Sequence, residues 1–175
     1  FAWRNLLPMV AVAQIISVIV VHNVAGHPYR QPFPLRESSD AMRMSGTGSE
    51  LLGSKGYADY VRNLQQLVRK SGFVAGEPVF DFTGHYPGAL YAIGASPVAM
   101  AWTLGGSSNS ESFVTSVLDR MDRRKLKNAW LLTEPHGPRK LSTDILERYG
   151  LSLAKDYILV GSLNSPTNVL WNRSF

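Results

Sequence analysis

The pattern of apolar and polar residues begins with one long hydrophobic stretch. No charged residue occurs from Asn5 to Val21, and residues 6–21 are apolar apart from Gln14 and Ser17. A bilayer is spanned by a helix of roughly 20 apolar residues. We therefore expect residues 1–25 to form a transmembrane helix, with a signal peptide or a buried core segment as the alternatives.

The next segment, residues 26–56, has the composition of a linker. Its prolines oppose regular structure, and the residues that follow them are small and polar. We expect a linker that continues into a loop covering the globular part. Because the sequence begins at Phe1 rather than Met, we also expect the hydrophobic helix to be the last span of a longer protein.

Residues 57–175 alternate between the apolar spacing of helices and that of strands. The spacing predicts helices at 57–70, 87–94 and 142–150, a long helix that starts at Ser108 and reaches Lys127, and strands at 79–83, 97–104, 129–133, 157–163 and 168–171. Such alternation is typical of a mainly parallel sheet. The expected fold is a three-layer α/β domain with helices on both faces of the sheet.

Composition and charge restrict the chemistry. The 175 residues, of which 45% are hydrophobic, suffice for one domain and an appendage, and the net charge of +5 suits a phosphate-bearing partner. No nucleic acid is expected, because no aromatic residues interleave with the basic residues of 120–127. The absence of cysteine excludes thiolate chemistry, and the four histidines lack metal-ligand spacing. We expect neither a metal nor a cofactor.

Polar residues follow three of the predicted strands, in the segments 84–88, 105–110 and 134–139. The carboxyl ends of parallel strands meet at one edge of the sheet, where open α/β sheets bind ligands. We therefore expect the three segments to share one crevice. The candidate ligand-binding residues are Asp81, Thr83, His85, Tyr86, Gly88, Ser107, Ser108, Glu134, His136 and Arg139.

Several of these residues also have a structural interpretation. The loop before the long helix could hold a phosphate at the helix N-terminus, but Ser108 and Glu111 have the spacing of a capping box, which we favour. Asp81 in a buried strand could be held by backbone N–H groups. A triad of Ser108, His136 and Asp81 would imply a small secreted hydrolase, although no Gly-x-Ser-x-Gly motif supports it.

Five motifs occur in an order that resembles a known class of protein. They are Pro28-Tyr29-Arg30, the Asp-x-Thr-Gly-x-x-Pro-Gly run at 81–88, Ala101-Trp102-Thr103-Leu104-Gly105-Gly106, Ala129-Trp130-Leu131-Leu132-Thr133 and Asp156-Tyr157-Ile158-Leu159-Val160-Gly161. Together they resemble the C-terminal extracytoplasmic domain of polytopic bacterial inner-membrane proteins that are similar to GT-C glycosyltransferases, which use sugars carried on polyprenyl phosphate.

The resemblance implies an accessory domain that covers the active site and helps select the sugar carrier or acceptor. It places the domain on the periplasmic or extracellular side of the bacterial inner membrane, with a lipid bilayer and a polyprenyl-phosphate-linked sugar as partners. In that family the catalytic acidic residue lies in an early loop that this chain does not match, so the chain alone is not expected to be catalytic. The alternative is a membrane-anchored, non-catalytic module that binds a sugar or an anion.

Overall fold

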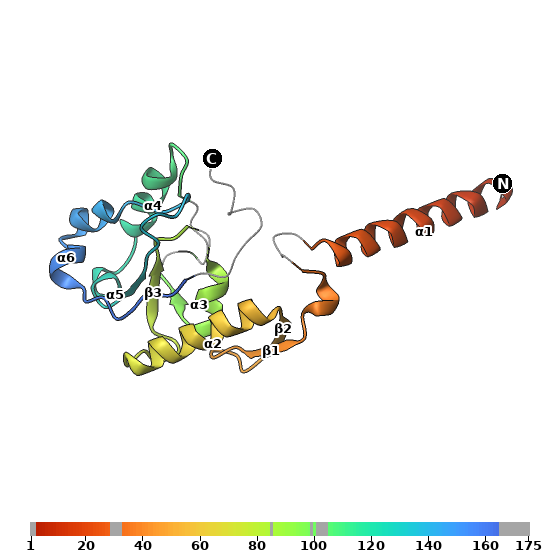
Figure 1. Cartoon of the computed structure of the whole chain (residues 1–175). Coiled ribbons are helices and arrows are strands. Elements are labelled where there is room, and N and C mark those ends of the chain that lie inside the picture. The colour runs from red at the N-terminus through yellow and green to blue at the C-terminus, as the bar shows by residue number, and fades with distance from the viewer. Residues whose placement is uncertain (1–2, 29–32, 85, 99, 101–104, 165–175) are drawn as a thin grey trace. The chain divides into compact units, whose positions relative to one another are not determined.

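A computed structural model describes residues 3–28, 33–84, 86–98, 100 and 105–164 (Figure 1). Its contacts divide the chain into two compact units. One unit comprises Phe1–Met42, Leu52–Tyr60 and Asn164–Phe175, and the other comprises Arg43–Leu51 and Val61–Leu163.

Helix α1 runs from Trp3 to Gly26 as one uninterrupted helix (Figure 1). The stretch Leu6–Gly26 has a mean hydropathy of 2.0, and none of it is buried. Its leucine, isoleucine and valine side chains are exposed around the whole helix. The expected long apolar helix is confirmed. By length and composition it could cross a membrane, a criterion that a signal sequence also meets.

The segment expected to be a linker contains regular structure. A 3₁₀ turn spans Leu35–Glu37, and strands β1 (Asp40–Arg43) and β2 (Glu50–Gly53) form a two-stranded sheet. The prediction of an irregular loop was wrong here. Composition alone did not show the turn between the strands, which is closed by backbone hydrogen bonds from Met44 N to Ser49 O (2.8 Å) and from Gly48 N to Met44 O (2.9 Å).

Helix α2 (Lys55–Lys70) forms where the helical spacing predicted it. Its buried residues recur every three or four positions, which places them on one face. These residues are Ala58, Val61, Leu64 and Gln65. The helix ends before Gly72, whose φ of 89° is readily adopted only by glycine.

The sheet of the second unit is parallel and small. Strand β3 (Pro78–Asp81) lies between β4 (Ser96–Pro97) and β5 (Trp130–Leu132), and it pairs with both in parallel. Helix α3 (Pro87–Ile93) connects β3 to β4. A mixed α/β fold with a parallel sheet is thus confirmed, while the three-layer arrangement stays a prediction. Residues 101–104 and 168–171 of two predicted strands lie outside the described residues.

The main hydrophobic core is built on one face of β3. Phe80 and Phe82 alternate along the chain, and their rings lie 4.3 Å apart between centroids. The core also contains buried residues from helices α4 (Ser110–Leu118) and α5 (Arg123–Lys127) and from the 3₁₀ helix η2 (Thr143–Tyr149). These residues include Val114, Leu118, Leu126, Ile145, Leu146 and Tyr149.

The long helix predicted from Ser108 to Lys127 is two helices. The capping box is also wrong, because α4 begins at Ser110 with Asn109 as its N-cap, and Asn109 makes no side-chain capping bond. The second helix starts anew after Asp122, whose carboxylate accepts a hydrogen bond from Arg124 N at 2.9 Å. An aspartate that caps the next turn competes with helix continuation.

The predicted strand at 157–163 is also wrong. The chain forms a short helix, α6 (Leu153–Asp156), and residues 157–163 then pair with no strand in the described part of the chain. Ile158 and Leu159 are 90% and 83% exposed. The run is rich in β-forming residues, but strand propensity depends on neighbours that pack against the side chains, and no neighbouring strand lies beside this run among the described residues.

Gln65 provides a test of the second unit. Its buried amide Nε2 donates to Arg43 O at 2.7 Å and to Ala92 O at 2.8 Å. We expect Gln65→Leu to lower the free energy of unfolding by about 1–3 kcal/mol, because it removes the donor for two carbonyl groups. Gln66, the exposed neighbour of Gln65, gives the matched control. Gln66→Leu should change the free energy of unfolding by no more than about 0.5 kcal/mol. Denaturant unfolding in mild detergent, followed by circular dichroism, measures both; equal losses would contradict the role assigned to Gln65.

Candidate functional site

The predicted site lies at the end of β3, where Phe82 follows the last strand residue. Phe82 N donates to Leu132 O at 2.8 Å, so the pairing with the β5 chain continues one residue past β3. Phe82 O accepts a hydrogen bond from Leu141 N at 2.9 Å. The segment that follows β5 therefore returns to the end of β3. Residues 134–141 thus lie where the crevice was predicted.

Glycines let the three strand-exit segments approach one another at this point. A Cβ atom on Gly84 or on Gly105 would collide with Arg139 O, and a Cβ on Gly84 would also press on Gly105 N. Gly84 has a φ of 74° in addition. The three segments thus lie together, but backbone atoms fill the middle of the junction. We call this contact of Gly84, Gly105 and Arg139 the glycine junction.

Asp81 is the last residue of β3 and holds the turn that follows this strand. One carboxylate oxygen, Oδ1, accepts hydrogen bonds from Thr83 N at 2.8 Å and from Thr83 Oγ1 at 2.5 Å. The two residues are only 3% and 2% exposed. This arrangement fits the structural interpretation of Asp81, since its Oδ1 stabilises a tight turn.

The other candidate residues differ in position. Ser107 is tied into its own loop, because Ser110 Oγ lies 2.7 Å from the Ser107 hydroxyl and accepts from Ser107 N at 3.2 Å. Glu134 is half-buried, and its carboxylate packs so closely on Gly137 that a Cβ there would not fit. His85 lies outside the described residues. The remainder are the half-buried Tyr86 and Arg139 and the exposed Gly88, Ser108 and His136. Whether any of these residues binds a ligand stays a prediction.

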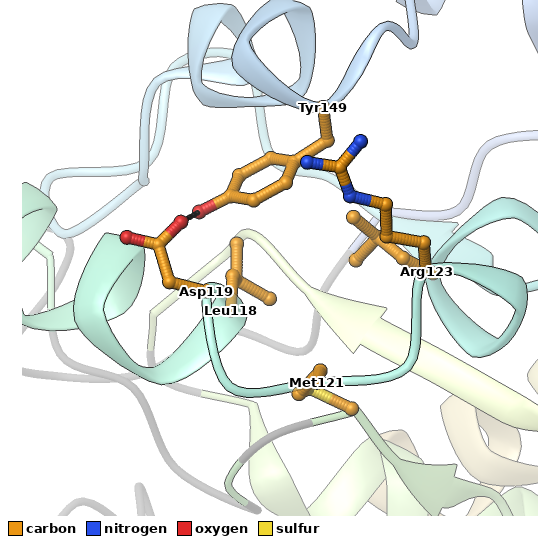
Figure 2. Close-up of a pocket in the computed structure, with 6 residues that line it drawn as sticks. Leu118, Asp119, Met121, Arg123 and Tyr149 are labelled. Carbon is orange, nitrogen blue, oxygen red and sulfur yellow. Dashed lines mark hydrogen bonds between the residues drawn. The ribbon is translucent and has the colours of Figure 1, made fainter.

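A pocket of about 40 Å³ lies in a different place, between α4, α5 and η2 (Figure 2). A water molecule needs roughly 10–15 Å³ by this measure, so the pocket holds about three waters and is too small to enclose a sugar ring. Its lining residues are Leu118, Asp119, Met121, Arg123, Leu126 and Tyr149.

Tyr149 is the polar centre of this pocket. Its hydroxyl points at Asp119 (Figure 2), and its single proton is shared between Asp119 Oδ1 at 3.0 Å and Thr115 O at 3.1 Å. Burial raises the pKa of Tyr149, and the hydrogen bond to the Asp119 carboxylate and its negative charge raise it further. Arg148 Nη2 lies 3.6 Å from Asp119 Oδ2. The carboxylate is therefore occupied by partners within the domain.

Sequence reasoning missed both the glycine junction and the pocket. The glycines at the strand exits were the available signal for the junction, since glycine permits close backbone approach. Nothing in the sequence pairs Asp119 with Tyr149. Among the residues that the structure describes, no group of three His, Asp or Glu residues could hold a metal ion.

Comparisons with protein-family models, with curated proteins and with solved structures found no match to this chain. Its function therefore has to be inferred from its own residues.

The glycine junction can be tested with two glycines that share the same φ of 74°, Gly84 and Gly150. We expect Gly84→Ala to cost about 2–5 kcal/mol, the sum of roughly 1–2 for the left-handed backbone and 1–3 for overpacking against Arg139 O. Nothing lies within 4 Å of a Cβ at Gly150, so Gly150→Ala should cost only the backbone term of about 1–2 kcal/mol. Denaturant unfolding of both variants measures the difference, and similar losses would show that the junction is not tightly packed.

The raised pKa of Tyr149 predicts a loss of stability at alkaline pH. The folded state favours the neutral phenol, so this contribution is complete below the ordinary pKa of about 10 and disappears as pH rises through the higher folded pKa. Tyr149→Phe should flatten that alkaline decline and, at pH 7, cost about 0.5–1.5 kcal/mol for the lost hydrogen bond.

Tyr91→Phe is the control, because hydrogen bonds from Ser49 and Thr47 lower the pKa of this exposed tyrosine instead. Loss of the Tyr91 hydroxyl should not flatten the decline of the unfolding free energy at alkaline pH. Unfolding free energies measured from pH 7 to 11 compare the three proteins. If Tyr149→Phe keeps the same alkaline slope as the unmodified chain, the assigned pKa direction is wrong.

Proposed function

We propose that this chain is the membrane-anchored, extracytoplasmic accessory domain of a glycosyltransferase-like membrane protein, with a three-layer α/β architecture. The observation that carries the proposal is α1. Its window Leu6–Gly26 is apolar, long enough to cross a bilayer, and buried nowhere.

Exposure of α1 to water would be costly. Fully burying a leucine, isoleucine or valine side chain contributes roughly 1.5–3 kcal/mol, and such side chains cover α1 on all sides. A helix that is hydrophobic all round is typical of a membrane span or a buried core helix, and α1 is not buried. A lipid bilayer is the environment that removes the apolar side chains on every side of α1 from water.

An accessory role accounts for the site better than catalysis within this chain. Oδ1 of Asp81 stabilises a turn, whereas Ser108 and His136 are exposed on loops. That arrangement gives no support to the hydrolase alternative. The resemblance to the extracytoplasmic domains of GT-C-like proteins supports a role in selecting a polyprenyl-phosphate-linked sugar or its acceptor, at the loops around the glycine junction.

The membrane assignment can be tested in α1 itself. Ile16 lies near the middle of the apolar window, where a lysine costs about 2.5–3.5 kcal/mol of insertion free energy. We expect the full chain, expressed in bacteria, to stay in the membrane fraction after alkaline carbonate extraction, and Ile16→Lys to move much of it into the soluble fraction. Ile16→Leu is the matched control and should behave as the unmodified chain.

Two further results separate the alternatives. Removal of α1 by processing, detected as a lower intact mass, would identify a signal sequence and overturn the anchor. The glycosyltransferase-like assignment expects several further apolar spans encoded upstream in the parent gene, whereas an anchored sugar- or anion-binding module expects one or two at most. A parent gene without further spans would leave the membrane anchor in place and overturn the transferase assignment.

A further inference from the structure

Helix α5 and the turn before it carry a dense group of basic residues. We call them the basic α5 surface: Arg120, Arg123, Arg124, Lys125 and Lys127. Leu126 is the one buried residue of α5, and it anchors the helix in the core. Every other residue of α5 is exposed. The helix therefore presents its cations to the surroundings.

The acidic residues of the same stretch make contacts of their own and form no ion pair with these cations. Asp119 accepts the Tyr149 hydroxyl and pairs with Arg148, and Asp122 caps α5 through Arg124 N. Among the residues that the structure describes, no carboxylate lies within ion-pair distance of any member of the basic α5 surface.

This arrangement is unfavourable for the domain by itself. Arg123 and Lys127 are four residues apart on one helix, where like charges repel. The position of the cations at the C-terminal end of a short helix offsets part of that repulsion. A surface of this kind is stabilised by a dense array of negative charge from outside the domain.

We propose that the basic α5 surface binds the anionic phospholipid headgroups of the membrane in which α1 is anchored. The inference rests on the membrane anchoring proposed above. Clusters of Lys and Arg are attracted by anionic lipid headgroups, and a domain tethered by an inserted α1 meets those headgroups at a high effective concentration. Residues 119–128 contain no aromatic residue for stacking on bases, which favours lipid over nucleic acid.

The test uses the full chain reconstituted in nanodiscs. The chain has no cysteine, so Asn128→Cys, exposed at the end of α5, places one fluorophore beside the surface. Quenching by headgroup-labelled lipid then reports contact with the membrane. We expect stronger quenching in nanodiscs containing phosphatidylglycerol than in neutral phosphatidylcholine, and a loss of the difference at high salt. The same label at Asn63→Cys, exposed on α2, is the control site.

Charge variants decide whether these cations cause the contact. Each cation near an anionic surface contributes about five-fold to the affinity, so Arg124→Gln/Lys125→Gln should weaken docking about 25-fold. Arg69→Gln/Lys70→Gln removes the same pair of exposed residue types from α2 and should leave docking unchanged. Arg123→Lys/Arg124→Lys keeps the charge and should retain docking. Circular dichroism melting confirms that each variant is folded.

Three outcomes would overturn the proposal. The first is equal quenching in anionic and neutral nanodiscs, and the second is an equal effect of the α2 and α5 charge pairs. The third is reduced hydrogen exchange of residues 119–128 with an added oligonucleotide but not with anionic lipid, which would assign the surface to nucleic acid. Failure of the chain to enter nanodiscs at all would overturn the membrane anchoring first, and this inference with it.

Discussion

The contact between backbone atoms at the glycine junction is the constraint on which the second unit depends. A carbonyl oxygen, Arg139 O, occupies the space that a side chain at Gly84 or Gly105 would need. This contact and the hydrogen bond from Leu141 N to Phe82 O fix the chain across the end of β3. Leu141 then enters the core, and η2 follows directly. The junction thereby determines where η2 lies, and with it the position of Tyr149 against α4.

The acidic residues around α4 and α5 serve the fold. Asp119 connects α4 to η2 through Tyr149 and Arg148, and Asp122 caps the start of α5 through Arg124 N. Because these carboxylates make contacts within the domain, no ion pair joins them to the neighbouring cations in the part of the chain that the structure describes. The same interactions that break the expected long helix thus orient α5 and leave its positive charge available to a partner.

Periodicity predicted helix α2, whose buried residues recur with the period of a helix. Strands β3 and β5 were predicted from short runs of apolar residues, although burial does not alternate along either strand. The helix break at Asp122 was missed, since capping competes with propensity at a single residue. The run at 157–163 was misjudged because a strand depends on its pairing neighbours. For the site, parallel topology predicted that the strand exits converge, but glycine shows only that close approach is permitted and not which segment approaches.

The proposed membrane anchor and the proposed role of the basic α5 surface depend on each other physically. Attraction between cations and anionic headgroups falls off within about 8–10 Å at physiological salt, so a freely diffusing domain with a few exposed cations would bind weakly. The stretch between α1 and β1 extends by at most roughly 3.5 Å per residue, which confines the domain near the membrane once α1 is inserted. Under that confinement a few exposed cations suffice to favour one orientation, which the proposed accessory role would require.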